Sequence, residues 1–493
     1  MAINEGEVGR AVRRDSPWWT NPNWAHNDLD LRAVDGSGLG YDPAPLGSLS
    51  TDGLYLLYGP RRAGKTVAVK RAIQKLLDAG TEPLRVIRVS VDGWRANRLG
   101  TLHEYVTRVA TTSIGGASRY WFIDEITATQ GDWWSVIKDL RDNTSLRSDC
   151  VVLTGSSNQD LDAAIKAFAG RRGGAVDPDR CLLPMSFYDF CAATGRTPTS
   201  LSDLPDMRPD ELMSDNAQST WRDLIPVTDD LVAAWQAYLE VGGYPKAVSD
   251  WRAGNQISAV TWGALWDVVR GEAVTDNISE STVANILAGI SRRLTSTVAI
   301  RPMAEDVGVR IETLERRIDA LVQAFLVWKC PAADASGRSA PRRQGKLYFT
   351  DTLLARLPEL VIGSLPVDIT HLNEQQLGMA LVSWNEHARP GSLRSGDWVT
   401  FYKTDQSEID FAGRCSDNGK RATPLDGKYI SGAWRRDALT IRNSKLGQGI
   451  LATRDVLSIE ADEPVWAIPA AFIAYALGAN RVRQLPRTPI LYR

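Results

Sequence analysis

The feature that most constrains this chain is the segment at residues 59–66, which reads G-P-R-R-A-G-K-T. It matches the pattern G-x-x-x-x-G-K-[ST], in which backbone N–H groups and a helix N-terminus form a cradle for phosphate. An apolar run at residues 54–58 predicts a strand before the loop, and residues 66–79 predict a helix after it. This order of strand, loop and helix is the one that phosphate binding requires, so the segment predicts a nucleotide site.

The loop residues have expected roles in binding ATP and Mg²⁺. Lys65 is expected to reach the β- and γ-phosphates, and the Thr66 hydroxyl is expected to bind the metal ion. ATP and Mg²⁺ are therefore the cofactors that the sequence predicts. The residues predicted to bind them are Gly59, Pro60, Arg61, Arg62, Ala63, Gly64, Lys65, Thr66 and Val67.

A second motif, R-Y-W-F-I-D-E at residues 119–125, is an apolar strand that ends in two carboxylates. At the carboxyl edge of a parallel sheet, Asp124 would lie beside the phosphates and hold Mg²⁺ through water. Glu125 would orient or deprotonate the attacking water. A plain polar turn is the alternative, but hydrolysis of ATP needs a metal-holding acid and a base at this edge.

Two later segments supply candidates for sensing the γ-phosphate and stabilising its transition state. Residues 151–158 form a strand followed by small polar residues, of which Thr154 and Ser156 are the candidate sensors. Capping of the next helix is the equal alternative. Arg171 would stabilise transition-state charge, either in its own subunit or in a neighbour of a homo-oligomer. Its alternative is a solvated surface arginine.

Composition narrows the remaining choices. A chain of 493 residues predicts several domains. A formal net charge of −2 gives no overall attraction to nucleic acid or membrane, so any nucleic-acid contact must be local. The five cysteines lack metal-ligand spacing and fit reduced thiols. With no apolar run of about 18 residues and no apolar leader, we expect a cytoplasmic protein without a membrane span.

Changes in composition and in predicted secondary structure along the chain divide it into five parts. Residues 1–50 are rich in proline and tryptophan and indicate an irregular, extended arm whose indoles need a surface to pack against. Residues 51–196 alternate strands with helices, which predicts a parallel sheet covered on both faces. Residues 197–280 are predicted as an insertion and helical lid, with a loop at 197–230. The last two parts are residues 281–350 and 351–493.

The part at residues 281–350 has the pattern of a winged helix. Residues 304–308 fit a helix and tight turn, and residues 311–321 fit a second helix with an apolar stripe. Arg310, Arg316 and Arg317 lie outside this stripe and are candidates for contacting DNA or RNA phosphates. Acidic residues are interleaved with them, so a purely structural winged helix is the alternative.

The C-terminal part carries two strand-like segments with acidic residues. Asp410 lies in the first, and Asp426 lies in the second, two residues before Lys428. With Glu374 from a helical stretch, these groups resemble the D…(D/E)-x-K site of metal-dependent nucleases, in which carboxylates hold Mg²⁺. The sequence thus offers a second metal site at Glu374, Asp410 and Asp426. The alternative is a domain that shares only the fold and serves as an interaction module.

Taken in order, these motifs resemble a family: AAA-type ATPases of bacteria and archaea whose C-terminal domain of unknown function looks like a restriction endonuclease. The resemblance implies an α/β protein with a P-loop AAA-type core and parallel sheet, a winged-helix middle region and an endonuclease-like α/β C-terminal domain. The segments that carry it are residues 18–24, 58–66, 153–156, 169–171, 183–187, 238–245 and 346–351.

Three functions are compatible with the sequence. The first is ATP hydrolysis coupled to action on nucleic acid or on a protein partner. The second is a slow nucleotide-gated switch, in which ATP binding orders a recognition surface and turnover resets it. The third is a metal-dependent nuclease that acts through the C-terminal domain.

Overall fold

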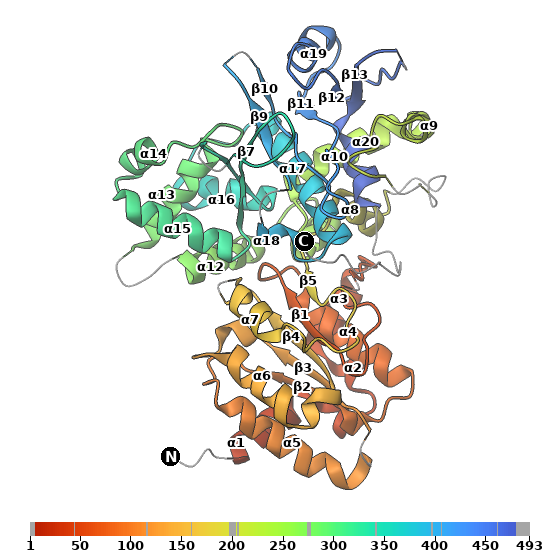
Figure 1. Ribbon diagram of the computed structural model, residues 1–493, viewed down its shortest axis with the longest axis vertical. Helices are drawn as coiled ribbons and strands as arrows, with labels where there is room; N and C mark the ends of the chain where they lie inside the picture. Colours follow the sequence, from red (N-terminus) through yellow and green to blue (C-terminus); the bar gives the residue numbers. More distant parts are fainter. Residues whose placement is uncertain are drawn as a thin grey trace.

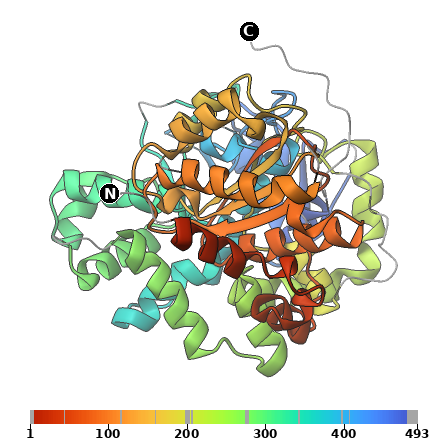
Figure 2. The same cartoon turned by 90° about the horizontal axis from the view of Figure 1, so that it is seen from below.

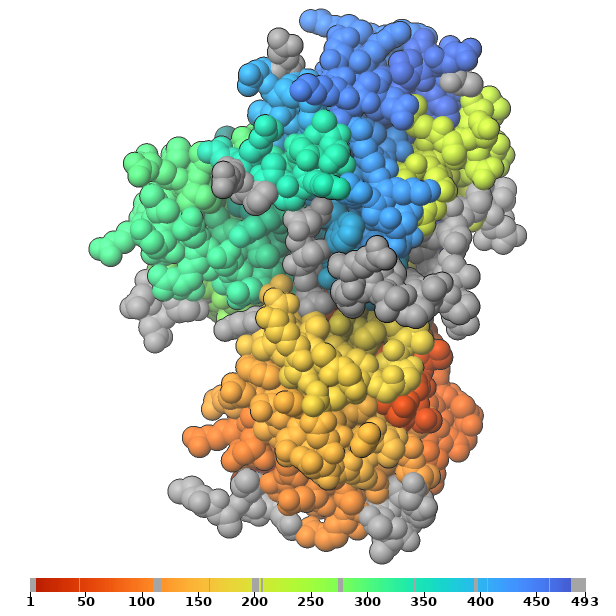
Figure 3. Space-filling view, viewed as in Figure 1, coloured from red at the N-terminus to blue at the C-terminus, as the bar shows by residue number. Residues whose placement is uncertain are grey.

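The protein has two lobes (Figures 1 and 3). The computed structural model describes residues 5–43, 45–114, 117–158, 160–196, 204, 207–273, 278–340, 343–395, 398–405, 407–460 and 462–479. The lobe coloured red to yellow, which we call the sheet lobe, contains strands β1 to β5. The other lobe, which we call the upper lobe, contains strands β6 to β13. No helix in the described part of the chain is long and apolar enough to span a membrane.

The sheet lobe is built on a parallel sheet of five strands in the order β2-β3-β4-β1-β5. Alternate residues of each strand face opposite sides, and both sides are apolar, so both faces are covered by helices. This confirms the predicted parallel sheet with helices on both faces. The strands are β1 (Leu54–Tyr58), β2 (Val86–Ser90), β3 (Tyr120–Asp124), β4 (Cys150–Gly155) and β5 (Asp179–Cys181); the helices are α4 (Lys65–Asp78), α5 (Arg98–Ile114), α6 (Trp133–Asn143) and α7 (Leu161–Phe168).

The N-terminal arm is helical where it is described, so the prediction of an extended arm was wrong. Helices α1 (Glu5–Asp15), α2 (Trp24–Asn27) and α3 (Leu29–Ser37) form most of it, and they pack on the sheet lobe (Figure 2). The glycines within α1 hide its helical pattern; Gly9 sits where a Cβ would lie 2.8 Å from the Tyr105 ring. The predicted packing of the indoles is confirmed, because Trp18 and Trp19 both donate to the Val86 carbonyl.

The segment predicted as a lid is mostly helical, including part of the stretch predicted as a loop. Residues 197–203, 205 and 206 lie outside the described residues. After them α9 begins at Asp215, capped by the Ser214 hydroxyl, so a helix occupies the later part of the predicted loop. The helices are α9 (Asp215–Asp223), α10 (Thr228–Val241), α11 (Pro245–Gly254) and α12 (Ala259–Ala273). Helix α8 (Phe187–Thr194) comes before them, within the part predicted as residues 51–196, but it packs on α10, α11 and α20 (Ala470–Gly478) of the upper lobe.

The next part has three helices and then an antiparallel strand pair, and the winged helix stays a prediction. Gly308 ends α14 in the left-handed region at φ 76°, as a tight turn needs. Arg310 and Arg316 are exposed, but Arg317 is buried and donates to the Ala273 carbonyl of α12, so it does not face solvent. The elements are α13 (Glu280–Ser291), α14 (Ile300–Val307), α15 (Ile311–Gln323), β6 (Val327–Cys330) and β8 (Lys346–Phe349).

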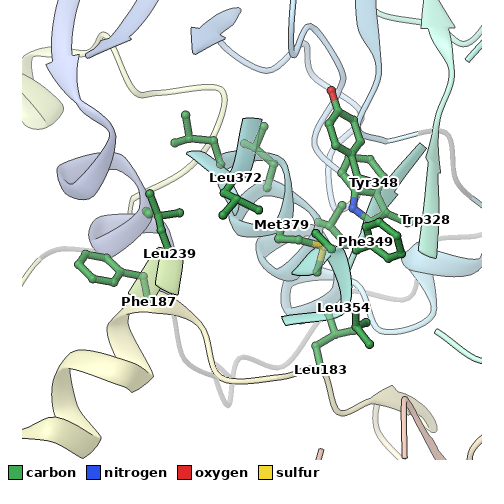
Figure 4. Close-up of a cluster of buried hydrophobic side chains, with 14 of the residues drawn as sticks. Leu183, Phe187, Leu239, Trp328, Tyr348, Phe349, Leu354, Leu372 and Met379 are labelled. Carbon is green, nitrogen blue, oxygen red and sulfur yellow. The ribbon is translucent and has the colours of Figure 1, made fainter. Parts of the chain in front are cut away.

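The C-terminal part is α/β, with a parallel three-stranded sheet β11-β12-β13 and a second sheet β10-β9-β7. One continuous core joins it to the two preceding parts. Figure 4 shows α17 side chains within this core, with Phe187 and Leu239 on one side and Trp328 and Tyr348 on the other. The elements are β7 (Ala332–Ala333), α16 (Thr352–Ile362), α17 (Ile369–Ala388), α18 (Ser392–Ser395), β9 (Phe401–Lys403), β10 (Glu408–Ile409), β11 (Leu425–Gly427), α19 (Arg435–Arg442), β12 (Gly449–Thr453), β13 (Val465–Pro469) and α20 (Ala470–Gly478).

Candidate functional site

The loop at residues 59–66 joins β1 to α4 at the carboxyl edge of the sheet, as predicted. Two glycines give it its shape. Gly59 and Gly64 have φ of 140° and 105°, a region that side chains disfavour, and a Cβ on Gly59 would lie 2.2 Å from the Leu182 carbonyl oxygen. Since α4 begins at Lys65, the loop leads directly into a helix N-terminus, where backbone N–H groups favour an anion.

Lys65 lies inside the loop. Its Nζ donates to the Gly59 and Pro60 carbonyls at 2.8 and 2.9 Å. Burial lowers the pKa of Lys65, and the charges of Glu125 and Asp124 oppose that effect. A cation held by two loop carbonyls, beside two carboxylates, is placed to meet phosphate oxygens in the same loop.

Asp124, at the end of β3, is the centre of a buried network. It accepts from Thr66 Oγ1 at 3.3 Å, from Arg88 at 2.7 Å and from the Thr154 hydroxyl. Burial alone would raise the pKa of Asp124, but the Arg88 charge and the Thr154 hydrogen bond lower it, so the carboxylate is ionised. Sequence reasoning missed Arg88, although its signal was present: it is the one charged residue of strand β2.

Glu125 belongs to a second, more exposed chain of hydrogen bonds. Its N–H donates to Thr154 Oγ1 at 3.2 Å, and its carboxylate accepts from Ser156 Oγ at 3.3 Å. Ser156 in turn accepts from Arg61 Nε of the loop at 3.2 Å. Neither candidate sensor caps α7, whose N-cap residue is Asp160, so the capping alternative was wrong.

The oxygen donors at this edge fit Mg²⁺. Thr66 Oγ1 and an Asp124 carboxylate oxygen lie 3.3 Å apart, and hydroxyl and carboxylate oxygens are ligand types that Mg²⁺ uses together with phosphates. The ion, when bound with ATP, neutralises phosphate charge. Thr66 and Asp124 are the residues that would hold it.

Arg171 lies at the other edge of the sheet, so a role in its own subunit's site was a wrong prediction. Its guanidinium pairs with Asp142 at 2.7 and 2.9 Å on the surface. The adjacent Arg172 carbonyl accepts from Leu54, the first residue of β1, whereas the phosphate loop follows Tyr58 at the end of that strand. At about 3.3 Å per residue, the strand separates Arg171 from the phosphates by more than 10 Å.

The acidic residues of the C-terminal part do converge. Phe411 pairs with Leu425 as an antiparallel bridge, which places Asp410 beside Asp426, and the Gly427 N–H donates to Asp410 at 2.9 Å. Lys428 Nζ lies 3.4 Å from Asp426 Oδ1. Burial, followed by the Asp410 charge, raises the pKa of Asp426.

A buried lysine lies among these carboxylates. Lys346 of β8 is completely buried, and its Nζ lies 3.0 Å from Glu374, 2.9 Å from Glu408 and 3.0 Å from Asp410. Among the described residues, no three His, Cys, Asp or Glu side chains are arranged to hold a metal ion. The predicted metal site at Glu374, Asp410 and Asp426 is therefore not formed: the Lys346 ammonium contacts Glu374 and Asp410, and Asp426 pairs with Lys428 instead.

Comparison with known families agrees with the geometry of the sheet lobe. Residues 51–191 match the model of a family described as an AAA domain. Residues 232–358 match a family described as a domain of unknown function, DUF8612. The first match spans all five strands of the parallel sheet and every residue of the candidate ATP site.

Individual relatives add little. An uncharacterized protein of Haemophilus influenzae is 22% identical over 376 residues, covering 74% of this chain and 81% of that protein. Two solved structures each cover 68% of this chain: the ORC2 protein of Aeropyrum pernix in ADPNP-ADP complexes, with 12% identity, 96% of that chain and a TM-score of 0.30, and Cdc6p of Pyrobaculum aerophilum, with 13% identity, 95% of that chain and a TM-score of 0.23. TM-scores this low support no conclusion about function.

The assignment rests on two agreeing observations. The family model matches the segment that forms the parallel sheet, and the loop, Lys65, Thr66 and Asp124 lie together at its carboxyl edge. Residues 51–191 form a P-loop ATPase domain of the AAA type.

Proposed function

We propose that the protein binds ATP with Mg²⁺ in the loop at residues 59–67 and hydrolyses it. The observation that carries this proposal is the contact of Asp124 with Thr66, which joins the phosphate loop to the acidic strand end. Glu125, the next residue, would deprotonate the attacking water. The Thr154 hydroxyl donates to the Asp124 carboxylate and accepts from the Glu125 N–H. Thr154 would thereby hold both acidic residues in position.

We further propose that turnover is transmitted to the upper lobe, which acts on nucleic acid or on a protein partner. The phosphate edge contacts that lobe directly. The Tyr58 and Phe325 rings stack with centroids 5.5 Å apart, the Tyr58 hydroxyl donates to Glu386 at 3.5 Å, and the Asn158 N–H donates to the Gln323 carbonyl at 2.9 Å. Gln323 ends α15, the helix that presents Arg316 to solvent.

DNA or RNA should raise the rate of ATP hydrolysis several-fold if the upper lobe acts on nucleic acid. The assay is phosphate release by the full chain with Mg²⁺, with and without single- and double-stranded DNA and RNA. If none of these nucleic acids changed the rate of ATP hydrolysis, the result would favour action on a protein partner, assembly with copies of this chain, or a slow nucleotide-gated switch. Absence of any hydrolysis would contradict the enzymatic proposal.

Lys65→Ala should weaken ATP binding roughly tenfold or more, because a charge-assisted contact with phosphate contributes about 1.5–3 kcal/mol. Binding is measured by calorimetric titration. Lys75→Ala is the matched control, since Lys75 lies on the same helix with its side chain 62% exposed. Equal affinity in the two variants would reject the loop as the phosphate site.

A further inference from the structure

An acidic residue of the upper lobe reaches the phosphate loop. Glu272, in the last turn of α12, places Oε1 3.3 Å from Arg61 Nε. The same Arg61 Nε donates to Ser156, the hydrogen-bond partner of Glu125. Arg61 is thus shared between the catalytic edge of the sheet lobe and a carboxylate that belongs to the other lobe.

Glu272 responds to the charges of the phosphate site. Burial raises its pKa, the positive charge of Arg61 opposes this, Glu125 raises it further and Lys65 lowers it. The carboxylate therefore lies within electrostatic range of three groups at the ATP site. A phosphate group in the loop would have the same sign of charge as Glu272 and would repel it.

We propose that Glu272 competes with the nucleotide phosphates for Arg61, so that ATP binding breaks the Arg61–Glu272 ion pair and loosens the last turn of α12 from the phosphate loop. This regulatory role deepens the proposed function and rests on it. Phosphate oxygens in the loop are the stronger competitor, because the phosphates of ATP together carry more negative charge than the single carboxylate of Glu272.

The break would be passed to the rest of the upper lobe because α12 is fixed there. Leu265 and Val269 of this helix are buried in the core of that lobe. The Ala273 carbonyl, one residue after Glu272, accepts from Arg317 of α15 at 3.2 Å. Glu272 therefore moves together with α12 and α15. When its ion pair with Arg61 is lost, both helices lose this link to the phosphate loop.

Glu272→Gln should bind ATP roughly threefold or more tightly than the parent, because the variant lacks the charge that competes for Arg61 and repels phosphate. Affinity for ATP is measured by titrating the full chain with a fluorescent ATP analogue. Asp267→Asn is the matched control: it removes a negative charge from the exposed face of the same helix, where Asp267 pairs with Arg270 at 2.8 Å. It should leave the affinity unchanged.

A second measurement follows α12 itself. Amide hydrogen exchange in the last turn of α12 should increase when ATP is added to the parent, and it should already be increased in Glu272→Gln without ATP. If the parent and Glu272→Gln bound ATP with equal affinity and amide exchange in α12 did not change, competition between Glu272 and phosphate for Arg61 would be rejected. The proposed function would remain intact. A parent that binds no ATP would overturn both.

Discussion

Glu125→Gln should bind ATP as the parent does and hydrolyse it about 10²-fold more slowly or worse, the usual loss when a general base is removed. The amide cannot accept the proton of the attacking water. Its oxygen can still accept the hydrogen bond from Ser156, so the local arrangement should persist. Phosphate release under saturating ATP gives the rate, and a separate titration gives the affinity.

Glu104→Gln controls for the charge change in this experiment. Glu104 is an exposed acid on α5, in the same lobe, and its substitution should alter neither rate nor affinity. If Glu125→Gln hydrolysed ATP at the parent rate, another group would be the base. If it lost ATP binding instead, Glu125 would be holding the nucleotide or the loop and not the water.

The ATP site could be predicted from the sequence to the extent that its signals are local. The loop, the strand before it and Asp124 at the end of an apolar strand each follow from a short segment and the geometry of a parallel sheet. Arg88 and Glu272 could not be placed in the same way. Their contacts with Asp124 and Arg61 depend on strand order and on how the two lobes pack, which no short segment encodes.

The wrong placement of Arg171 in its own subunit's ATP site has a similar cause. The sequence places this arginine after α7, but it does not show that the chain has by then returned to the amino edge of the sheet, where Arg172 pairs with Leu54. The C-terminal part shows the reverse case. The sequence predicted that Asp410 and Asp426 lie side by side, and the isolated Phe411–Leu425 bridge brings them together although β10 and β11 belong to different sheets. The buried cation that joins Asp410 to Glu374 and Glu408 is Lys346, which follows a polar loop and looks like a surface residue.

Lys346→Met should destabilise the upper lobe by about 3–5 kcal/mol, because removing one partner of a buried ion network leaves uncompensated charge. Burial alone would lower the pKa of Lys346, but Asp410, Glu374 and Glu408 together raise it, so the ammonium is charged at every physiological pH. Methionine has a similar length and no charge. Urea unfolding of the full chain, followed by circular dichroism, measures the loss.

Lys403→Met is the matched control for the loss of a lysine in this region. Lys403 also pairs with Glu408, at 2.6 Å, but its side chain is 48% exposed. Exposed ion pairs contribute about 0–1 kcal/mol, so this variant should stay close to the parent. Equal stability of Lys346→Met and Lys403→Met would show that the buried ammonium is not what keeps the acidic cluster folded.

The loss of stability in Lys346→Met should also depend on pH, and the direction of that dependence identifies its cause. Burial and the Asp410 charge already raise the pKa of Glu374, and the ammonium limits that rise and lowers the pKa of Asp410. Without Lys346 both carboxyl pKa values move further upward relative to the unfolded chain, so the folded variant takes up protons as pH falls. Stability of the variant should therefore fall as pH rises above the ordinary carboxyl pKa of about 4. The difference from the parent should be larger at pH 8 than at pH 5. A difference independent of pH would mean that Lys346 contributes packing and not charge.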